Sequence, residues 1–597
     1  MIFEWNNLHV KWPNSNRNGY YYYAFKDISG RIESGQLLVI MGYFGSGNSA
    51  LMNTLAGTLP KNSLIKGEIL IDKRNIQYCE RHKLFTYLPK KPKYWKDLTA
   101  RETIEYTAKL KMKNKTCFNK KFDELIKNLD LDDILDKKMD NLSRGEQNKG
   151  DLKRVFIACS LISDSPIIFI EEPIQKLNTL ISQKIIKELK RQALQYNKII
   201  IISTLKPGHC FLKITDKLII FNSGHMIYNG YTNKLVDIQK SKPRHIPLSQ
   251  YIFWLSITPH PCIDCHTRLI EEPTFKWIKE KSNIMNYKPK LSEIFILLKR
   301  RILLKKKRPI NFLKYTLPGV LLFYFILVIS FNSIYNYLNI LYNMPFEKND
   351  SFLFSNFPML FDILKAPLLA ISLYLKLGVS NAFMNEIPII KEECAFFYYS
   401  PTSYYLSVLV YELIYNYFWI FTGYFIIQRF YIHIRSMVYI YFILVSPIIS
   451  IPISLFTGIY FTRPFIIITL NVISSLLICL YDCYNLQTDI DITNSYKLLL
   501  WMPSIIVPEQ YFIRIMSYYL IDDITFKNER IIENIAKSSK LFKIQPIYDS
   551  LLIKCGGNAL SVYTHWIIVI IIPIFFILMS IYVLRKKMKI SLLFYNK

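Results

Sequence analysis

The sequence predicts an α/β domain with an antiparallel β subdomain, followed by an all-α membrane domain of six helices, and three observations lead to this fold class. A buried strand, a glycine-rich loop and a helix start follow one another at residues 38–51. An apolar strand that ends in two acidic residues lies at residues 165–173. From about residue 311 onward, long apolar segments dominate the chain. With 597 residues the chain is too long for one hydrophobic core, so at least two domains are expected.

The glycine-rich loop at residues 42–49 has the spacing of a phosphate cradle. A P-loop has glycine, four residues, glycine, lysine, and then serine or threonine. Gly42, Gly47 and Ser49 match this pattern. The backbone N–H groups of such a loop turn toward phosphate oxygens at a helix amino terminus, and the hydroxyl group can hold Mg²⁺. We therefore predict that ATP and Mg²⁺ bind at Gly42, Gly45, Gly47, Asn48, Ser49 and Ala50, with Ser49 on the metal.

The lysine of the P-loop pattern is absent, because Asn48 stands in its place. That lysine normally reaches the β- and γ-phosphates. An asparagine side chain offers a shorter and neutral donor, which forms a weaker hydrogen bond than a charged group. We expect nucleotide binding to persist in weakened form and the transfer of the γ-phosphoryl group to be impaired.

The strand at residues 165–173 carries the second part of the predicted site. Its apolar residues end in Glu171 and Glu172, followed by Pro173. In P-loop NTPases a strand of this kind places a carboxylate near Mg²⁺. Together with the P-loop, the strand resembles the nucleotide-binding domain of ATP-binding cassette (ABC) transporters, whose corresponding strand ends in Asp-Glu-Pro. The resemblance implies that Glu171 supports Mg²⁺ and that Glu172 is the general base.

Other family elements are present in position but altered in residue. The stretches at residues 85–90 and 97–103 resemble the loop and helix start where the family has a glutamine that touches Mg²⁺ and couples to the membrane domain. Lys90 or Pro89 takes that slot, and the resemblance implies that Lys90 is a nucleotide-binding residue. Asn178 replaces an aspartate, and Leu205 or Lys206 replaces the histidine that contacts the γ-phosphate. His209 would reach that slot only if the loop shifted by several residues.

The motif that contacts a partner's nucleotide, Leu-Ser-Gly-Gly-Glu in the family, fits two registers. One register uses residues 142–146 and includes Ser143 and Gly145. The other uses residues 148–151, includes Gly150, and is favoured because residues 153–155 resemble the helix that follows the motif. In either register a glycine has become Arg144 or Lys149, and a large side chain there would crowd the backbone against the γ-phosphate.

The second half of the chain predicts a membrane domain. Apolar segments long enough to span occur near residues 315–334, 359–383, 404–427, 437–461, 465–481 and 566–584. The formal net charge is +30, and basic residues at 299–308 precede the first segment, which favours a membrane surface over nucleic acid as the partner. Six spans place the nucleotide domain and both termini in the cytoplasm. No cleaved signal peptide is expected at the amino terminus.

The domain order resembles the G subfamily of ABC half-transporters, the White or pigment-precursor type. The nucleotide domain (1–235) comes first, then a linker (236–310), then the transmembrane domain (311–597) with a large external loop at about 482–565. Residues 386–407 also resemble that subfamily's connection between spans. Among the charged residues within the spans, Glu412 matches an acidic position of the subfamily, and we expect it to pair with Lys376.

The resemblance implies a dimeric transporter of hydrophobic or lipid-like molecules that is driven by ATP. Because each ATP would lie between one chain's P-loop and the other's altered motif, a heterodimer with an intact partner is favoured over a homodimer. The alternative is a non-transporting pseudo-ATPase that serves as a membrane scaffold or nucleotide sensor, since fold does not imply function.

Overall fold

The computed structural model describes part of the chain and divides it into two compact units. The described residues are 1–13, 21–59, 63–75, 84–112, 118–144, 148–175, 177–205, 209–235, 245–257, 278–279, 289–308, 321, 324–325, 328, 371–380, 382–383, 386–396, 398–430, 436–461, 463, 465–473 and 562–588. The first unit contains Met1–Arg300, Pro388–Tyr404 and Arg585–Lys597, and the second contains Arg301–Ile387 and Tyr405–Leu584.

A mostly parallel sheet of six strands forms the centre of the first unit. The strand order is β10-β9-β3-β8-β7-β6, and only β9 and β10 pair antiparallel. The strands are β3 (Leu37–Gly42), β6 (Phe85–Leu88), β7 (Ile167–Glu171), β8 (Ile199–Thr204), β9 (Lys217–Asn222) and β10 (His225–Tyr231). Every residue of β3, β6, β7, β8 and β9 is buried, as expected for a sheet covered on both faces.

A second, antiparallel sheet covers one face of the parallel sheet. Its order is β11-β4-β1-β2, with β5 paired to β4. The strands are β1 (Ile2–Pro13), β2 (Tyr21–Glu33), β4 (Leu64–Ile71), β5 (Arg74–Asn75) and β11 (Ile278–Lys279). Between the two sheets, the ring of Phe3 packs against Phe85 and Phe169 with centroids 5.8 Å and 6.2 Å apart. The predicted α/β fold with an antiparallel β subdomain is confirmed.

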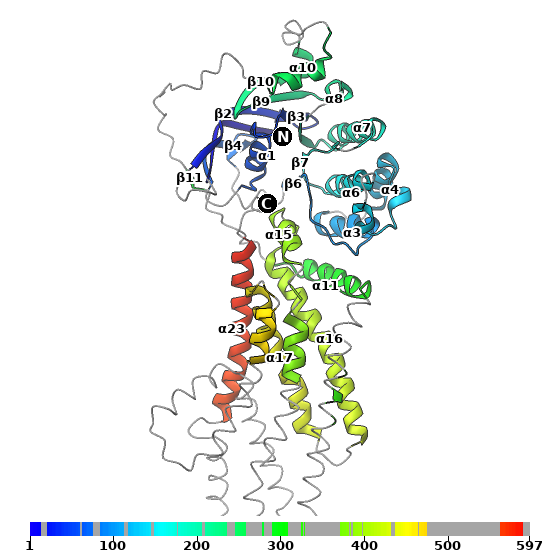
Figure 1. Ribbon diagram of the computed structural model, residues 1–597, viewed down its shortest axis with the longest axis vertical. Helices are drawn as coiled ribbons and strands as arrows, with labels where there is room; N and C mark the ends of the chain where they lie inside the picture. Colours follow the sequence, from blue (N-terminus) through cyan, green and yellow to red (C-terminus); the bar gives the residue numbers. More distant parts are fainter. Residues whose placement is uncertain are drawn as a thin grey trace, which may run out of the picture. The chain divides into compact units, whose positions relative to one another are not determined.

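Helices cover the other face of the parallel sheet (Figure 1). They include α3 (Ala100–Lys111), α4 (Phe118–Leu129), α5 (Met139–Ser143), α6 (Asn148–Ile162), α7 (Thr179–Gln195) and α8 (His209–Ile214), with α10 (Leu248–Leu255) beside β9 and β10. The short helices η2 (Asp132–Ile134) and η3 (Thr232–Lys234) complete this set, while α1 (Asn48–Ala56) lies between the two sheets. Thr99 and Glu102 form a capping box at the predicted start of α3.

The second unit is helical in its described part. It contains helical residues Ile371–Ser380, α17 (Ser436–Tyr460), and most of α16 (Pro401–Phe430) and α23 (Val562–Met588). Among the described residues, one helix, Trp566–Met588, is long and apolar enough to cross a membrane. The predicted span at 315–334 and the predicted external loop at about 482–565 lie almost wholly outside the described residues, so the count of six spans stays a prediction.

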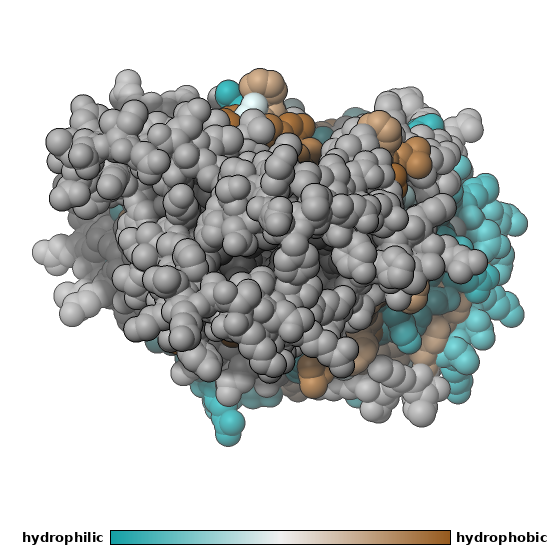
Figure 2. All heavy atoms as spheres, turned by 90° about the horizontal axis from the view of Figure 1, so that it is seen from below, coloured by the Kyte–Doolittle hydropathy of each residue, from teal (hydrophilic) through white to brown (hydrophobic). Residues whose placement is uncertain are grey.

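Hydrophobic side chains on the helices of the second unit are exposed. On α16 these include Ile414, Phe418 and Phe425, and on α23 they include Ile571 and Leu578. Figure 2 shows hydrophobic atoms that reach the surface in the view from below. In water such side chains would cost free energy, and a hydrocarbon environment removes that cost.

A buried cluster of charges also lies in the second unit. Arg301, near the end of α11 (Leu291–Lys306), pairs with Glu386 and Glu412 at 3.0 Å each. Lys305 lies 4.0 Å from Glu412. The ion pairs of Glu412 are therefore with arginine and lysine of α11, whereas we expected Lys376. Removal of one partner from such a buried pair leaves an uncompensated charge, so the pairs restrict where these helices can pack.

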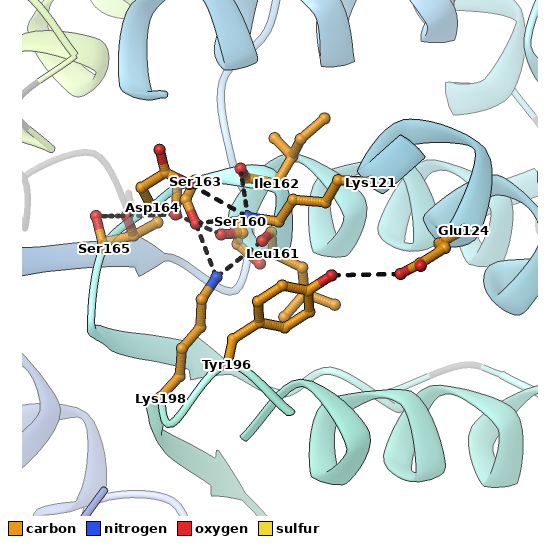
Figure 3. Close-up of polar contacts among 11 residues, drawn as sticks. Lys121, Glu124, Ser160, Leu161, Ile162, Ser163, Asp164, Ser165, Tyr196 and Lys198 are labelled. Carbon is orange, nitrogen blue, oxygen red and sulfur yellow. Dashed lines mark hydrogen bonds and ion pairs between the residues drawn. The ribbon is translucent and has the colours of Figure 1, made fainter. Parts of the chain in front are cut away.

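Two buried lysines cap the carboxyl end of α6 in the first unit (Figure 3). Lys121 of α4 donates to the carbonyl oxygens of Ile162 and Ser163 and to Asp164. Lys198, just before β8, donates to the carbonyl oxygens of Leu161 and Ser163 at 3.0 and 2.7 Å. The last carbonyl groups of a helix lack partners within the helix, so the hydrogen bonds from both lysines satisfy carbonyl groups at this helix end.

The position of Lys198 weakens its proton affinity, because burial, with a smaller contribution from the positive charge of Lys121, lowers its pKa to about 7. An unfolded lysine has a pKa near 10.4. Between these two values the unfolded chain binds more protons than the folded chain, and the free energy of unfolding therefore rises as the pH rises.

We predict that Lys198→Met flattens this pH dependence. In the wild type, the opening free energy of amides at the end of α6 should increase from pH 7 to pH 9 by at most about 1.4 kcal/mol per pH unit. Amide hydrogen exchange of the full chain, corrected for intrinsic rates, measures it. Lys187→Met removes an exposed lysine of α7 and is the matched control, which should keep the wild-type slope. A slope that is equal in both variants would contradict the assignment.

Candidate functional site

The loop between β3 and α1 is shaped to hold an anion. Gly45 and Gly47 have φ values of +81° and +111°, in the region that favours glycine. A Cβ atom on Gly42 would lie 2.3 Å from the hydroxyl oxygen of Ser46, so this position also requires glycine. Gly47 caps α1 without a side-chain hydrogen bond, which leaves the first N–H groups of the nine-residue helix for a ligand.

Asn48 braces this loop from within. Its amide nitrogen donates to the carbonyl oxygen of Gly42 at 2.7 Å, and its amide oxygen accepts from the hydroxyl group of Ser46 at 2.9 Å. The side chain is buried. In contrast, Ser49 is exposed at the first turn of α1, while Ala50 is buried there. The residue in the lysine position therefore holds the loop together and brings no charge to it.

The two predicted acids lie at the same sheet edge as the loop. Glu171 ends β7 and is paired in register with Ser203 of β8, whose neighbour across the sheet is β3. One carboxylate oxygen of Glu171, Oε2, accepts a hydrogen bond from the backbone N–H of Lys90 at 3.0 Å. The other, Oε1, is buried and has no hydrogen-bond partner among the described residues. A buried carboxylate oxygen without a partner fits a Mg²⁺ ion or its water shell.

Glu172 follows in a strained conformation. Its φ is +48°, and its N–H donates to the carbonyl oxygen of Ser203 at 2.9 Å. Such a backbone costs about 1–3 kcal/mol in a residue other than glycine and is found at functional sites. Burial raises the pKa of the Glu172 carboxyl group, while the positive charge of Lys90 opposes this rise. A raised pKa favours proton acceptance at neutral pH.

Lys153 of α6 is a member of the site that the sequence did not single out. Its ammonium group donates to the carbonyl oxygen of Glu171 at 2.8 Å and to that of Lys90 at 3.4 Å. Burial lowers its pKa to about 8. In the sequence analysis Lys153 was used only as part of residues 153–155, which resemble the helix that follows the family motif. The sequence feature that could have identified Lys153 is its position on the apolar face of that helix, because a lysine at such a position is expected to be buried.

The loop after β6 is anchored within the first unit. The N–H of Lys93 donates to Glu392 of α15 (Ile387–Ala395) at 2.8 Å, and the indole N–H of Trp95 donates to Glu393 at 2.9 Å. Glu393 also pairs with Arg300 of α11 at 2.9 Å. These contacts hold residues 90–95 in place beside β7. They also place part of the predicted connection at 386–407 against the nucleotide-site loop.

The remaining predicted residues belong to segments of the chain other than the loop and the acidic end of β7. Ser143 ends α5, where its hydroxyl group donates to the carbonyl oxygen of Asp140, and Gly150 lies buried in the first turn of α6. Gly145 and Lys206 are outside the described residues. Asn178 caps α7 and is exposed, and Leu205 follows β8. The structure therefore joins the loop at 42–50, Lys90, Glu171 and Glu172 at one edge.

Sequence comparison identifies the family. Residues 25–175 match the family model described as ABC transporter. Residues 25–175 therefore carry an ABC transporter domain. Over 214 residues it is 29% identical to human ATP-binding cassette sub-family G member 5, which covers 36% of this chain and 33% of that protein. It is 30% identical over 212 residues to ABC transporter G family member 1 of Arabidopsis thaliana, or 34% of this chain and 28% of that protein.

The match to mouse ATP-binding cassette sub-family G member 5 covers more residues than the match to the human protein. It is 25% identical over 289 residues and covers 46% of this chain and 43% of that protein. The matched region of each of these relatives is thus less than half of its length. The resemblance to the G subfamily is confirmed, and an ABC transporter domain implies nucleotide (ATP) binding, typically with Mg²⁺.

The conformations of Gly45 and Gly47 predict different costs for the same substitution. A Cβ atom on Gly47 would lie 3.1 Å from the carbonyl oxygen of Ala24, whereas nothing lies within 4 Å of one on Gly45. Both alanines would be strained by a positive φ, but only Gly47→Ala would also displace the loop. We expect Gly47→Ala to bind MgATP about fivefold more weakly than Gly45→Ala, or about 1 kcal/mol. Titration with a fluorescent ATP analogue measures this, and equal affinities would refute the predicted displacement.

Proposed function

We propose that this chain is an ABC-type half-transporter that moves a hydrophobic or lipid-like substrate across a membrane as a dimer. The observation that carries the proposal is the meeting of the phosphate cradle with Glu171 and Glu172 at the carboxyl edge of the parallel sheet. In open α/β sheets ligands bind at this edge. The similarity to G-subfamily proteins supports the same proposal.

Each residue of the site has a role in this proposal. The backbone N–H groups of the loop at 42–50 bind the phosphates, and Ser49 with Glu171 would hold Mg²⁺, which neutralises phosphate charge when bound. Glu172 accepts the proton of the attacking water through its carboxylate, which its raised pKa favours. Ser143, Gly145 and Gly150 are proposed to approach the nucleotide of the partner chain.

We propose that hydrolysis at this chain's own site is weak or absent. Asn48 is neutral, and its amide is engaged with Gly42 and Ser46. The slot for the γ-phosphate histidine is taken by Leu205 or Lys206. With two electrostatic partners of the transferred phosphoryl group missing, transition-state stabilisation falls. A heterodimer with an intact second half-transporter is therefore favoured over a homodimer.

The proposed topology is that of a multi-pass membrane protein with six spans. The nucleotide domain (1–235), the linker (236–310) and both termini lie in the cytoplasm, and the transmembrane domain (311–597) contacts the lipid bilayer. The apolar helix Trp566–Met588, whose last turn carries the basic residues at 585–587, supports this orientation for the last span.

A second function is favoured by the internal hydrogen bonds of Asn48. Because they stabilise the loop without a ligand, the domain could serve as a pseudo-ATPase scaffold or nucleotide sensor that does not transport. Transport of a fluorescent phosphatidylcholine analogue in vesicles separates the two functions. Flux that depends on this chain and on ATP supports transport, whereas ATP binding without flux, with any co-expressed G-subfamily partner, supports the sensor.

We predict that Glu172→Gln abolishes the residual ATPase activity attributable to this chain's site. Loss of a general base reduces the rate by about 10²–10⁴-fold. Glu68→Gln, at an exposed position on β4, is the matched control and should retain wild-type activity. Phosphate release from the purified chain, alone and with its partner, is the measurement. A rate of about 1 s⁻¹ or more by the wild-type chain alone would contradict the proposed weak hydrolysis.

A further inference from the structure

The position of Lys90 is determined by hydrogen bonds of its backbone. It lies two residues beyond the end of β6, which pairs with β7. Its N–H donates to the carboxylate of Glu171 at 3.0 Å, and its carbonyl oxygen accepts from the ammonium group of Lys153 at 3.4 Å. Lys90 is therefore held at the sheet edge where the acids lie.

The side chain of Lys90 reaches toward the phosphate cradle. Its ammonium nitrogen lies 5.1 Å from the centroid of the Phe44 ring, within the distance of a cation–π interaction. Phe44 is the second residue of the loop after Gly42, and 65% of its surface is exposed. Lys90 itself is partly exposed. Its charge thus lies over the loop, on the side open to solvent.

Lys153 also carries a positive charge near Glu171 and Glu172, but its ammonium group is engaged by backbone carbonyl groups. Lys153 is buried and donates to the backbone carbonyl oxygens of Glu171 and Lys90, so its ammonium group stabilises the end of β7. Asn48 contributes no charge. A cation–π contact at an exposed ring contributes only about 0.5–1 kcal/mol, so the ammonium group of Lys90 can leave Phe44 for a stronger partner. A phosphate oxygen is such a partner.

We infer that Lys90 binds the terminal phosphate of a nucleoside triphosphate and replaces the lysine that the P-loop lacks. In this arrangement the cation belongs to the loop after β6 instead of the loop after β3, while the loop after β3 remains the phosphate cradle. This inference rests on the proposed function, because it assigns a ligand group within the same site. It requires that the affinity for a triphosphate depend on Lys90 more strongly than the affinity for a diphosphate.

Binding of MgATP and MgADP to the full chain in lipid nanodiscs tests the inference by calorimetric titration. Lys90→Gln installs the neutral residue that the family has at this slot. We expect it to weaken MgATP binding by about 10- to 100-fold, as for loss of a hydrogen bond to a charged group. MgADP binding should change by less than about threefold. Lys91→Gln, at the exposed neighbouring lysine, is the matched control and should match the wild type.

Two further variants separate the charge from the fold. Lys90→Arg keeps the cation and should bind MgATP within about threefold of the wild type. The double variant Asn48→Lys with Lys90→Gln restores the P-loop pattern and should recover most of the affinity that Lys90→Gln loses. This recovery would not occur if Lys90 only balanced the charge of the two acids.

The possible failures are distinct. If Lys90→Gln binds MgATP as the wild type does, or loses MgATP and MgADP affinity equally, the inference is wrong and the proposed function stands. If the double variant recovers nothing, Lys90 does not replace the P-loop lysine. If the folded wild-type chain binds neither nucleotide, the proposed ATP-binding function fails as well.

Discussion

The parallel register of β3, β8 and β7 is the constraint on which the candidate site depends. Parallel strands run in one direction, so the loop after β3 and the acids after β7 emerge at the same edge, although they lie more than a hundred residues apart in sequence. A parallel sheet is stable only when both faces are covered. Here α3, α6 and α7 cover one face, and α1 with the antiparallel sheet covers the other.

Helix α6 connects this constraint to the chemistry of the site. Two lysines cap its carboxyl end, which leads directly into β7, and Lys153 in its first half supports the acidic end of the same strand. Arg154 donates to the carbonyl oxygens of Leu129 and Asp130 and so ties the helix to α4. Because α6 is held at both ends, β7 presents Glu171 and Glu172 in a defined position.

The charges of the site are arranged differently from those of the P-loop pattern. The cradle contributes backbone dipoles alone, and the cations come from α6 and from the loop after β6. Buried carboxylates require such compensation, since an uncompensated charge in the interior is costly. Lys153 compensates from the buried side and Lys90 from the open side. The site thus keeps an electrostatic balance although position 48 has lost its charge.

Much of this protein could be predicted from local sequence patterns. The continuous apolar runs, the spacing of Gly42 and Gly47, and the acidic end of the strand at 165–173 predicted the α/β fold and the membership of Glu171 and Glu172 in one site. Each of these features can be recognised in a short stretch of sequence, because the spacing of glycines and the hydrophobicity of a strand involve only residues that are close together in the chain. The apolar segments also predicted the helices near 404–427, 437–461 and 566–584.

The tertiary structure decided which side chains meet. The sequence indicated that Asn48 was neutral, but only the fold showed its amide bound to Gly42 and Ser46. In the fold, Lys153 donates to the carbonyl oxygen of Glu171, Lys90 lies over the ring of Phe44, and Glu412 pairs with Arg301. Such contacts join residues far apart in the chain, and a charged side chain can choose among several partners within reach. The choice depends on burial and on distances between elements, which no local pattern encodes.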